Sequence, residues 1–579
     1  MELSNIIEEN NSVLKKFRRK NTLIRMKYLE YVPILVISNL STFLLVTVDG
    51  LVVGNFMGSM ALAAVNMFNP LAVLLSAYIA IIAHGIADSF ADAMVENDTK
   101  RIHHNRQAIK FVIVASVIIL SIVQVPIVHF AIHSYNLSPD MYEMAKTYAV
   151  VMLLSTPFGL ISSVGACQFE EIGKMKVLLK VSIVESIINL TLDLLLVGVF
   201  KLGVFGAGMA TSIASFVRAL LTTIYFLTKT ELYKSCSEKL RLCDIKEIVV
   251  GGLPYSVGIL TSAVCGYLML RLELYMYGES GGIVNGVCFF CLNVATVFIT
   301  STADANGPLN GIFLSMGDRI ATRNALKIAA RQIIVSVGLL TLLIELKPEW
   351  FYLINGVKDI PEFGIMALRI SALYFVFYGL NALFDGYFID RDSAKFTSRL
   401  VLIGDMLTPV VAFLFAKYIA VIYLWAADLV VRMIIFLAYL TKQLSIVIEE
   451  RREEREEKTI RDILYLEVEQ SEAEEAAEGL LQYAEEKNYS KEISINVANC
   501  IKEMVDYAVK AQDNIGIHIQ LVISFFKNGA TFIMLDDGEC LHLKKSNNYD
   551  TDKFLSLKKS AKSYKYQYIL NMNYTKFEF

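Results

Sequence analysis

Long apolar stretches follow one another between residues 31 and 441, and short polar segments separate them. An α-helix needs ~20 mostly apolar residues to cross the hydrocarbon core of a bilayer. About twelve stretches reach that length. The pattern therefore predicts about twelve membrane-spanning helices, near residues 31–53, 60–85, 109–133, 142–168, 177–200, 203–228, 248–276, 283–313, 325–346, 362–388, 398–418 and 420–441.

The pattern changes after about residue 442. Residues 443–460 are dominated by Glu, Arg and Lys and predict a charged helical linker. Beyond the linker, four segments alternate as strands do, and two longer segments have the periodicity of helices. We predict a small α/β two-layer sandwich over residues 461–579, with strands near 462–469, 515–526, 530–538 and 574–579 and helices near 471–487 and 492–511.

The composition excludes a soluble protein. Hydrophobic residues make up 55% of the 579 residues, and the mean hydropathy of +0.50 is too high for a soluble chain of this length. The net charge is -3, and the basic footprint of a nucleic-acid-binding protein is absent from the sequence. We therefore expect the lipid bilayer, and no nucleic acid, as a partner.

The basic residues predict the orientation of the helices. Residues 1–28 are polar and basic, so they do not resemble a cleavable signal peptide. Lys and Arg gather on the cytoplasmic side of membrane proteins, and the segments 99–110, 229–246 and 317–331 are rich in both. An even number of helices then returns the chain to the side where it began. The sequence predicts a multi-pass protein of the cell membrane with both termini in the cytoplasm.

Two short motifs suggest that the helices form two equivalent halves. "GSMALAAVN" at residues 58–66 and "GESGGIVN" at residues 278–285 each follow the first helix of a six-helix set. Transporters commonly build their cavity at the interface of two such repeats. We predict an N-terminal lobe over residues 29–228 and a C-terminal lobe over residues 229–442.

Three polar residues lie on one face of the fifth predicted helix. Glu185, Asn189 and Asp193 are spaced four apart, which places them on one stripe. A charged group at the bilayer centre costs ~3 kcal/mol or more, so the stripe must face protein or water. A carboxyl group buried there can take up a proton in one conformation and release it in another. The alternative is a paired structural charge or a side chain that caps the helix.

Asp49 is a second acidic residue in an apolar helix, the first one. By the predicted orientation it lies in the same half of the membrane as Asp193, so the two carboxyl groups could share a cavity. Arg218 on the sixth predicted helix could pair with Glu185. In the second lobe, several polar residues are candidates for lining a substrate path, although those near helix ends can also reach solvent: Arg271, Glu273, Asp304, Asn306, Asp385, Asp405 and Asp428.

Two segments resemble a transporter family. "LVTVDGLVVGNFMGSMALAAVNMFNPLAVLL" and "INLTLDLLLVGVFKLGVFGAGMATSIAS" are similar to the first-helix and fifth-to-sixth-helix signatures of the multidrug and toxin extrusion (MATE) family. The resemblance covers roughly residues 25 to 442. It implies two six-helix lobes and cation-coupled efflux of small organic, often cationic, compounds. The coupling residues of the family fall on Asp49, Asn189 and Asp193, where the ion would be a proton or sodium. The resemblance implies no other metal and no cofactor.

The C-terminal segment resembles the ATP-binding domain of histidine kinases and anti-sigma-factor kinases (the GHKL type). "IMLDDGECL" places Asp536 and Gly538 at the adenine-contacting positions of that family. Asn499 and Glu503 fall on the family's Glu and Asn positions, apparently exchanged, and residues 541–570 contain no Gly for a phosphate lid. We therefore expect a degenerate regulatory or interaction domain that does not hydrolyse ATP and that could bind a cytoplasmic protein. Residual nucleotide binding is the alternative. A strand-ending turn alone would also account for Asp536 and Gly538.

Three functions are compatible with these features. The leading hypothesis is a cation-coupled exporter and not an enzyme. A flippase for a lipid-linked saccharide is the second, but it should show a basic central cavity, for which Arg271 and Arg369 are few. A membrane sensor or kinase that uses the C-terminal segment is the third, and the altered Asn499 and Glu503 speak against it.

Overall fold

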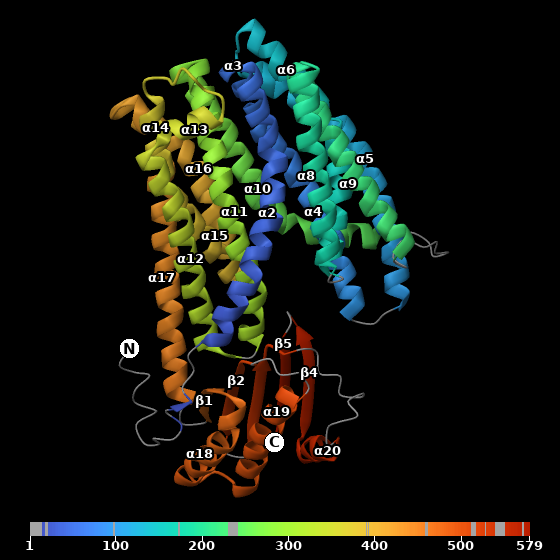
Figure 1. Ribbon diagram of the computed structural model, residues 1–579, viewed down its shortest axis with the longest axis vertical. Coiled ribbons are helices and arrows are strands. Elements are labelled where there is room, and N and C mark those ends of the chain that lie inside the picture. The colour runs from blue at the N-terminus through green and yellow to red at the C-terminus, as the bar shows by residue number, and fades with distance from the viewer. Residues whose placement is uncertain are drawn as a thin grey trace. The chain divides into compact units, whose positions relative to one another are not determined.

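The computed structural model forms two compact units. The tail unit comprises Met1–Pro33, Asp304–Ala329 and Tyr439–Phe579, and the membrane unit comprises Ile34–Ala303 and Ala330–Ala438. The elements of both are labelled in Figure 1. The described residues are 14, 16–17, 21–95, 99–171, 174–229, 241–315, 317–389, 391, 393–457, 461–510, 517–526, 529–538, 551–569 and 572–579. Parts of the predicted basic segments, residues 1–13 and 230–240, therefore lie outside them.

The first half of the membrane helices follows the predicted apolar stretches, except that the stretches 60–85 and 142–168 are each divided between two helices. The predicted helix 177–200 ends in a π-helical turn, η1 (Leu194–Val199), which begins directly after Asp193. The helices are α2 (Thr22–Met57), α3 (Ser59–Asn66), α4 (Asn69–Val95), α5 (Thr99–Ser134), α6 (Pro139–Met152), α7 (Ser155–Glu171), α8 (Met175–Asp193) and α9 (Gly203–Lys229).

The second half repeats this arrangement with an additional short helix, α13, that the sequence pattern did not predict. The helix α17 continues to Glu457, so most of the predicted charged linker belongs to it. The elements are α10 (Leu242–Tyr277), α11 (Glu279–Ser315), α12 (Arg319–Leu346), α13 (Pro348–Ile354), α14 (Gly364–Ala372), α15 (Phe375–Ile389), α16 (Ala394–Tyr418), η2 (Val421–Trp425) and α17 (Ala426–Glu457).

Ten helices of the described residues are long and apolar enough to cross a membrane, or eleven if the pair α6 and α7, bent by 44°, counts as one span. The helix α2 covers the first predicted stretch. It is not among these helices, and several of its side chains lie outside the description. Large apolar side chains face outward, for example Ile122 at 66% and Phe130 at 73% exposure. Such a surface is suited to lipid and not to water.

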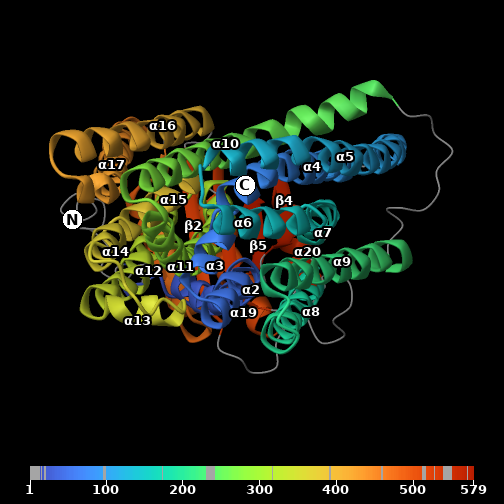
Figure 2. The ribbon, with the colours of Figure 1, turned by 90° about the horizontal axis from the view of Figure 1, so that it is seen from above.

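Glycines permit the closest helix contact of the membrane unit. A Cβ atom on Gly85 of α4 would lie 1.9 Å from the carbonyl oxygen of Ile248, and one on Gly252 of α10 would lie 1.8 Å from that of Ile81. The backbones of α4 and α10 therefore touch, and the two helices lie side by side in Figure 2. Small residues allow such approaches between membrane helices.

The two predicted repeat motifs begin at equivalent breaks. Gly58 separates α2 from α3 with φ 94°, and Gly278 separates α10 from α11 with φ 62°. Both angles lie in the left-handed region, which glycine adopts without steric cost. Each half thus starts with a long helix that ends at a glycine of this kind.

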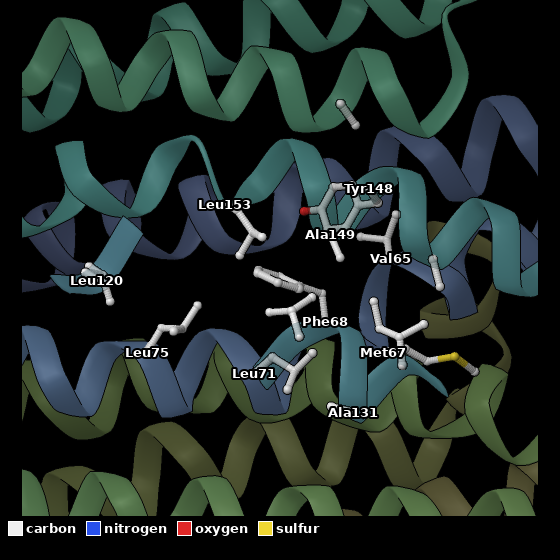
Figure 3. Close-up of a cluster of buried hydrophobic side chains, with 14 of the residues drawn as sticks. Val65, Met67, Phe68, Leu71, Leu75, Leu120, Ala131, Tyr148, Ala149 and Leu153 are labelled. Atoms are coloured by element: carbon white, nitrogen blue, oxygen red, sulfur yellow. The ribbon is translucent and has the colours of Figure 1, made fainter. Parts of the chain in front are cut away.

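A buried apolar cluster joins α3, α4, α5 and α6 in the first half. Val65, Met67, Phe68 and Leu71 pack against Leu153 and Tyr148, as Figure 3 shows. The ring of Phe68 meets that of Tyr148 edge to face, with centroids 5.9 Å apart. This packing fixes the Tyr148 ring and thereby the position of its hydroxyl group.

The C-terminal domain contains the predicted strands and helices and two further elements. Its sheet is antiparallel with the order β1-β2-β3-β5-β4. The sequence pattern missed β4 and α20. The elements are β1 (Arg461–Val468), η3 (Gln470–Glu472), α18 (Ala473–Glu486), α19 (Lys491–Lys510), β2 (Ile519–Phe526), β3 (Gly529–Asp536), α20 (Thr551–Ser560), β4 (Ser563–Ile569) and β5 (Met572–Glu578).

A short N-terminal segment belongs to the core of this domain. Phe17 is 1% exposed and packs with Leu14 against the same cluster as the buried faces of α18 and α19. Its carbonyl oxygen accepts a hydrogen bond of 2.9 Å from the N–H of Glu467, on the edge strand β1. The segment thus covers an edge that would otherwise be open to pairing.

Candidate functional site

Asp49 lies on α2 with only 2% of its surface exposed. Its carboxyl group accepts a hydrogen bond of 2.7 Å from the hydroxyl of Tyr148 on α6. The Thr211 hydroxyl on α9 lies 2.8 and 2.9 Å from its two oxygens. Three helices therefore meet at this carboxyl group.

Asn189 and Asp193 of α8 complete the cluster. Both are fully buried, and the Asn189 amide donates to the Thr211 hydroxyl at 3.0 Å. Asp193 lies beside Asp49, close enough for the two carboxyl groups to share a hydrogen bond when one of them carries a proton. The structure thus brings the three residues predicted for ion coupling into one site.

Several oxygens of this cluster have no hydrogen-bond donor among the described residues. They are both carboxyl oxygens of Asp193 and the side-chain oxygen of Asn189. A buried oxygen without a donor is unfavourable, so such an arrangement favours a bound proton or cation. Oxygen ligands are suited to hard cations such as sodium. Among the described residues, no group of three or more His, Cys, Asp or Glu is arranged to hold a metal ion.

Glu185, the third residue of the predicted stripe, has a different environment. Arg218 of α9 donates a hydrogen bond to its carboxyl group at 2.7 Å, which is the pairing expected from the sequence. The stripe on α8 therefore has an ion pair at Glu185. At its other end is Asp193, whose oxygens have no donor in the described part of the chain.

Tyr148 and Thr211 are functional candidates that sequence reasoning missed. Tyr and Thr are common in membrane helices of every kind. The residue type alone therefore does not indicate a functional site. For Thr211, the small polar run "MATSIAS" on α9 could have indicated a helix face toward a polar neighbour.

The second half holds a different buried charge. Arg432 of α17 donates to Asp405 of α16 at 2.9 Å, and its guanidinium lies 5.4 Å from the ring centre of Tyr378. The other Asp405 oxygen accepts bonds from Thr261 and Ser262 of α10 at 2.8 and 2.9 Å. Arg432 was not among the predicted residues.

The remaining second-half candidates are dispersed. Glu273 is buried and accepts a bond of 2.7 Å from Asn285, whereas Arg271 is exposed. Asp385 and Asp428 are half-buried on α15 and α17. Asp304 is exposed on α11 and, like Asn306, belongs to the tail unit and not to the Asp49 cluster.

The C-terminal domain does not fit ATP in the manner of the family that it resembles. One oxygen of Asp536 is already engaged, because it accepts bonds from the Gly538 N–H at 3.0 Å and from Asn573 at 2.6 Å. Asn499 is exposed at the position where the family has its general base, and amides do not abstract protons. The segment for the phosphate lid lies partly outside the described residues, since 539–550 are not among them.

Burial raises the pKa of Asp536 to about 6, although the bonds from Asn573 and Gly538 oppose the rise. The other oxygen of Asp536 has no donor among the described residues. His518 lies beside the same turn. Its ring nitrogen Nδ1 is 2.9 Å from one Asp537 oxygen, and its backbone N–H donates a hydrogen bond of 2.8 Å to the other.

Comparison with known proteins places this geometry in context. Residues 34–195 match the family model described as MatE. Multidrug export protein MepA of Staphylococcus saprophyticus is 23% identical over 259 residues, 44% of this chain and 56% of that protein. MepA of Staphylococcus aureus strain MSSA476 is 22% identical over 282 residues, 47% of this chain and 60% of that protein. The matches thus span little more than half the length of these curated relatives.

Solved structures are similar over a longer part of the chain. The inward-facing structure of a multidrug resistance MATE family transporter of the MOP superfamily has a TM-score of 0.66 at 18% identity and covers 74% of this chain and 99% of that one. The outward-facing structure of such a transporter has a TM-score of 0.60 at 18% identity, with 76% and 99% covered. The chain therefore has the polytopic helical fold of these transporters.

Proposed function

We propose that this chain is a MATE-type secondary transporter, which exports small organic, often cationic, compounds in exchange for a proton or sodium. The observation that carries this proposal is the group of buried oxygens on Asn189 and Asp193, beside Asp49, for which the described residues supply no donor. The similarity to multidrug export proteins supports the substrate class.

The cluster can couple ion binding to helix packing. Two adjacent buried carboxylates repel each other, and a proton or sodium ion between them removes that repulsion. Because Asp49 also holds the hydroxyls of Tyr148 and Thr211, a change at the carboxyl pair alters the contacts of α2, α6, α8 and α9 together. An ion that binds one arrangement of these helices better than the other shifts their populations.

The two other functions considered have weaker support. Arg271 is exposed, and Arg369 lies 3.8 Å from Glu345 in a partly exposed pair, so neither indicates a basic cavity for a saccharide phosphate. A kinase reaction would need a general base, and the described part of the C-terminal domain offers Asn499 in that place.

We further propose that the C-terminal domain lies in the cytoplasm and regulates transport. The positive-inside rule, applied to the basic segments, places it there. Leu14 and Phe17, which precede α2 in the sequence, pack in the core of this domain, and this supports a regulatory role.

Counterflow in proteoliposomes tests the transport assignment. Purified full-length protein would be reconstituted, and ethidium export would be followed with a pH gradient and a sodium gradient imposed separately. We expect one gradient to drive export and the Asp49→Asn variant to lose the response. Ethidium movement that is independent of both gradients, or full coupling in that variant, would contradict the proposal.

A further inference from the structure

A cleft of about 490 Å³ lies within the tail unit, between the start of α2 and the end of the sheet. Lys27, Leu29 and Glu30 of α2 form one wall. Asp537, at the turn after β3, and Tyr568 of β4 form the other. Gly538, which falls on the adenine-contacting position of the kinase-like family, also lines the cleft. The proposed transport function does not use the cleft.

The cleft has an excess of negative charge. Lys27 is almost fully buried and pairs with Glu30 at 2.9 Å, so these two charges balance. Asp537 then remains with His518 as its partner, an imidazole that is charged only when protonated. Behind this turn lies Asp536, fully buried, with one carboxyl oxygen that has no donor among the described residues and with Lys27 close enough to act on its charge.

Aromatic and apolar groups accompany this charge. Tyr568 is 39% exposed and Leu29 is 71% exposed, and both an aromatic and an aliphatic side chain therefore line the cleft. Carboxylates attract a cation, and an aromatic ring attracts one that is weakly hydrated. Both apolar groups would be of little use to a hydrated inorganic ion. The combination is suited to an alkylammonium group.

We propose that this cleft is a binding site for a small organic cation, with Asp537 as its counter-ion and Tyr568 as its aromatic wall. The site is separate from the Asp49 cluster and goes beyond the proposed transport activity. The Lys27–Glu30 ion pair lines the same cleft, so an ammonium group bound to Asp537 repels the nearby ammonium of Lys27. Occupation of the cleft therefore changes the ion pair on the first turns of α2.

Titration calorimetry with choline tests the proposal. The protein would be full-length and in lipid nanodiscs, and it would carry Asp49→Asn and Asp193→Asn, so that binding at the proposed transport site is removed. We expect choline to bind this protein and 3,3-dimethylbutan-1-ol, its neutral analogue of the same shape, to bind at least about tenfold more weakly. A failure of the transport proposal would leave this result unchanged.

Variants of the cleft identify the residues. Asp537→Asn should weaken choline binding about tenfold, because it removes the counter-ion and keeps the shape. Tyr568→Leu should weaken it about two- to fivefold, as expected for an exposed cation–π contact. Asp506→Asn, the matched control, removes an acidic charge from α19 outside the cleft and should leave binding unchanged. Circular dichroism would confirm that each variant is folded.

The outcomes separate the alternatives. Absence of choline binding, equal binding of the neutral analogue, or an equal loss in Asp506→Asn would overturn the proposal. So would binding of Mg·ATP that Asp537→Asn abolishes while choline does not compete, because the cleft would then be a nucleotide site. Loss confined to Asp537→Asn and Tyr568→Leu would support it.

Discussion

In the first half of the membrane unit, Asp49 and Asp193 lie side by side among hydroxyl and amide groups. In the second half, Asp405 is held by the guanidinium of Arg432 and by two hydroxyls of α10. Both sites bury a carboxyl group between helices, but among the described residues a basic side chain is paired with Asp405 and none is paired with Asp49 or Asp193.

This difference predicts a structural role for the carboxyl group of the second half and an ion-dependent role for those of the first. A carboxylate that is permanently paired with Arg holds helices together but cannot respond to an ion, since guanidinium does not lose its proton in proteins. A pair of carboxyl groups without such a partner depends on an ion from outside. Four predictions test this contrast.

The largest effect is expected at the first site. Asp49→Asn should reduce gradient-driven export at least about tenfold, because it removes the charge that binds the ion and retains the side-chain shape. Asp193→Asn should act similarly. Since the two groups share one site, the double variant should lose little more than either single variant. Initial rates of export in proteoliposomes would measure these losses. A loss in the double variant equal to the product of the two single losses would assign the residues to separate sites.

The second prediction concerns the ion pair between Arg432 and Asp405. Arg432→Met should lower the free energy of unfolding by about 3–5 kcal/mol, because it leaves the buried Asp405 without its counter-ion. The combination with Asp405→Asn should restore most of that stability. Thermal unfolding in detergent would measure both. Equal stability of Arg432→Met and the native protein would show that the pair is not structural.

The third prediction extends the contrast outside the membrane, to Asp536. Its folded-state pKa of about 6 exceeds the value of ~3.9 in an unfolded chain, so the folded state binds more protons between these values. The stability of the C-terminal domain should therefore fall, by up to about 3 kcal/mol, as the pH rises from 4 to 6.

Asp536→Asn should remove this pH dependence. Hydrogen exchange of amides in β3 and β5 of the full-length protein would measure it, with Asp506→Asn as a control that retains the slope. An unchanged slope in Asp536→Asn would mean that another group titrates.

The smallest effect is expected at Thr211. Thr211→Val removes the hydroxyl that contacts Asp49 and should cost about 1–2 kcal/mol of stability. It should also shift the pH or sodium dependence of export, whereas Thr191→Val, on the exposed side of α8, should alter neither. Identical ion dependence in both variants would exclude Thr211 from the site.

Sequence periodicity predicted the helices well because each one must bury its backbone groups within a long apolar segment. It also identified the stripe on α8, since residues spaced four apart necessarily share a helix face. Periodicity could not identify Tyr148, Thr211 or Arg432 as functional candidates. Each of these acts through a contact between helices that are distant in sequence, and periodicity within one helix contains no information on such contacts.

The C-terminal domain shows a similar limit. β2 and β3 are buried on both faces and have a strong apolar signal. The strand β4, "SYKYQYI", carries polar and aromatic residues at the edge of the sheet, where pairing with β5 and not burial determines its conformation. The roles of Asp49, Asn189 and Asp193 in coupling remain predictions, although the structure brings these residues together.

The contact of Gly85 with Gly252 also limits how this protein can vary. Most outward-facing positions accept any apolar residue, but these two admit no side chain, since even a methyl group would lie within 2 Å of a backbone carbonyl carried by the opposite helix. A compensating change on the partner helix cannot relieve an overlap with backbone. Saturation mutagenesis should therefore find both positions intolerant of alanine, independently of each other.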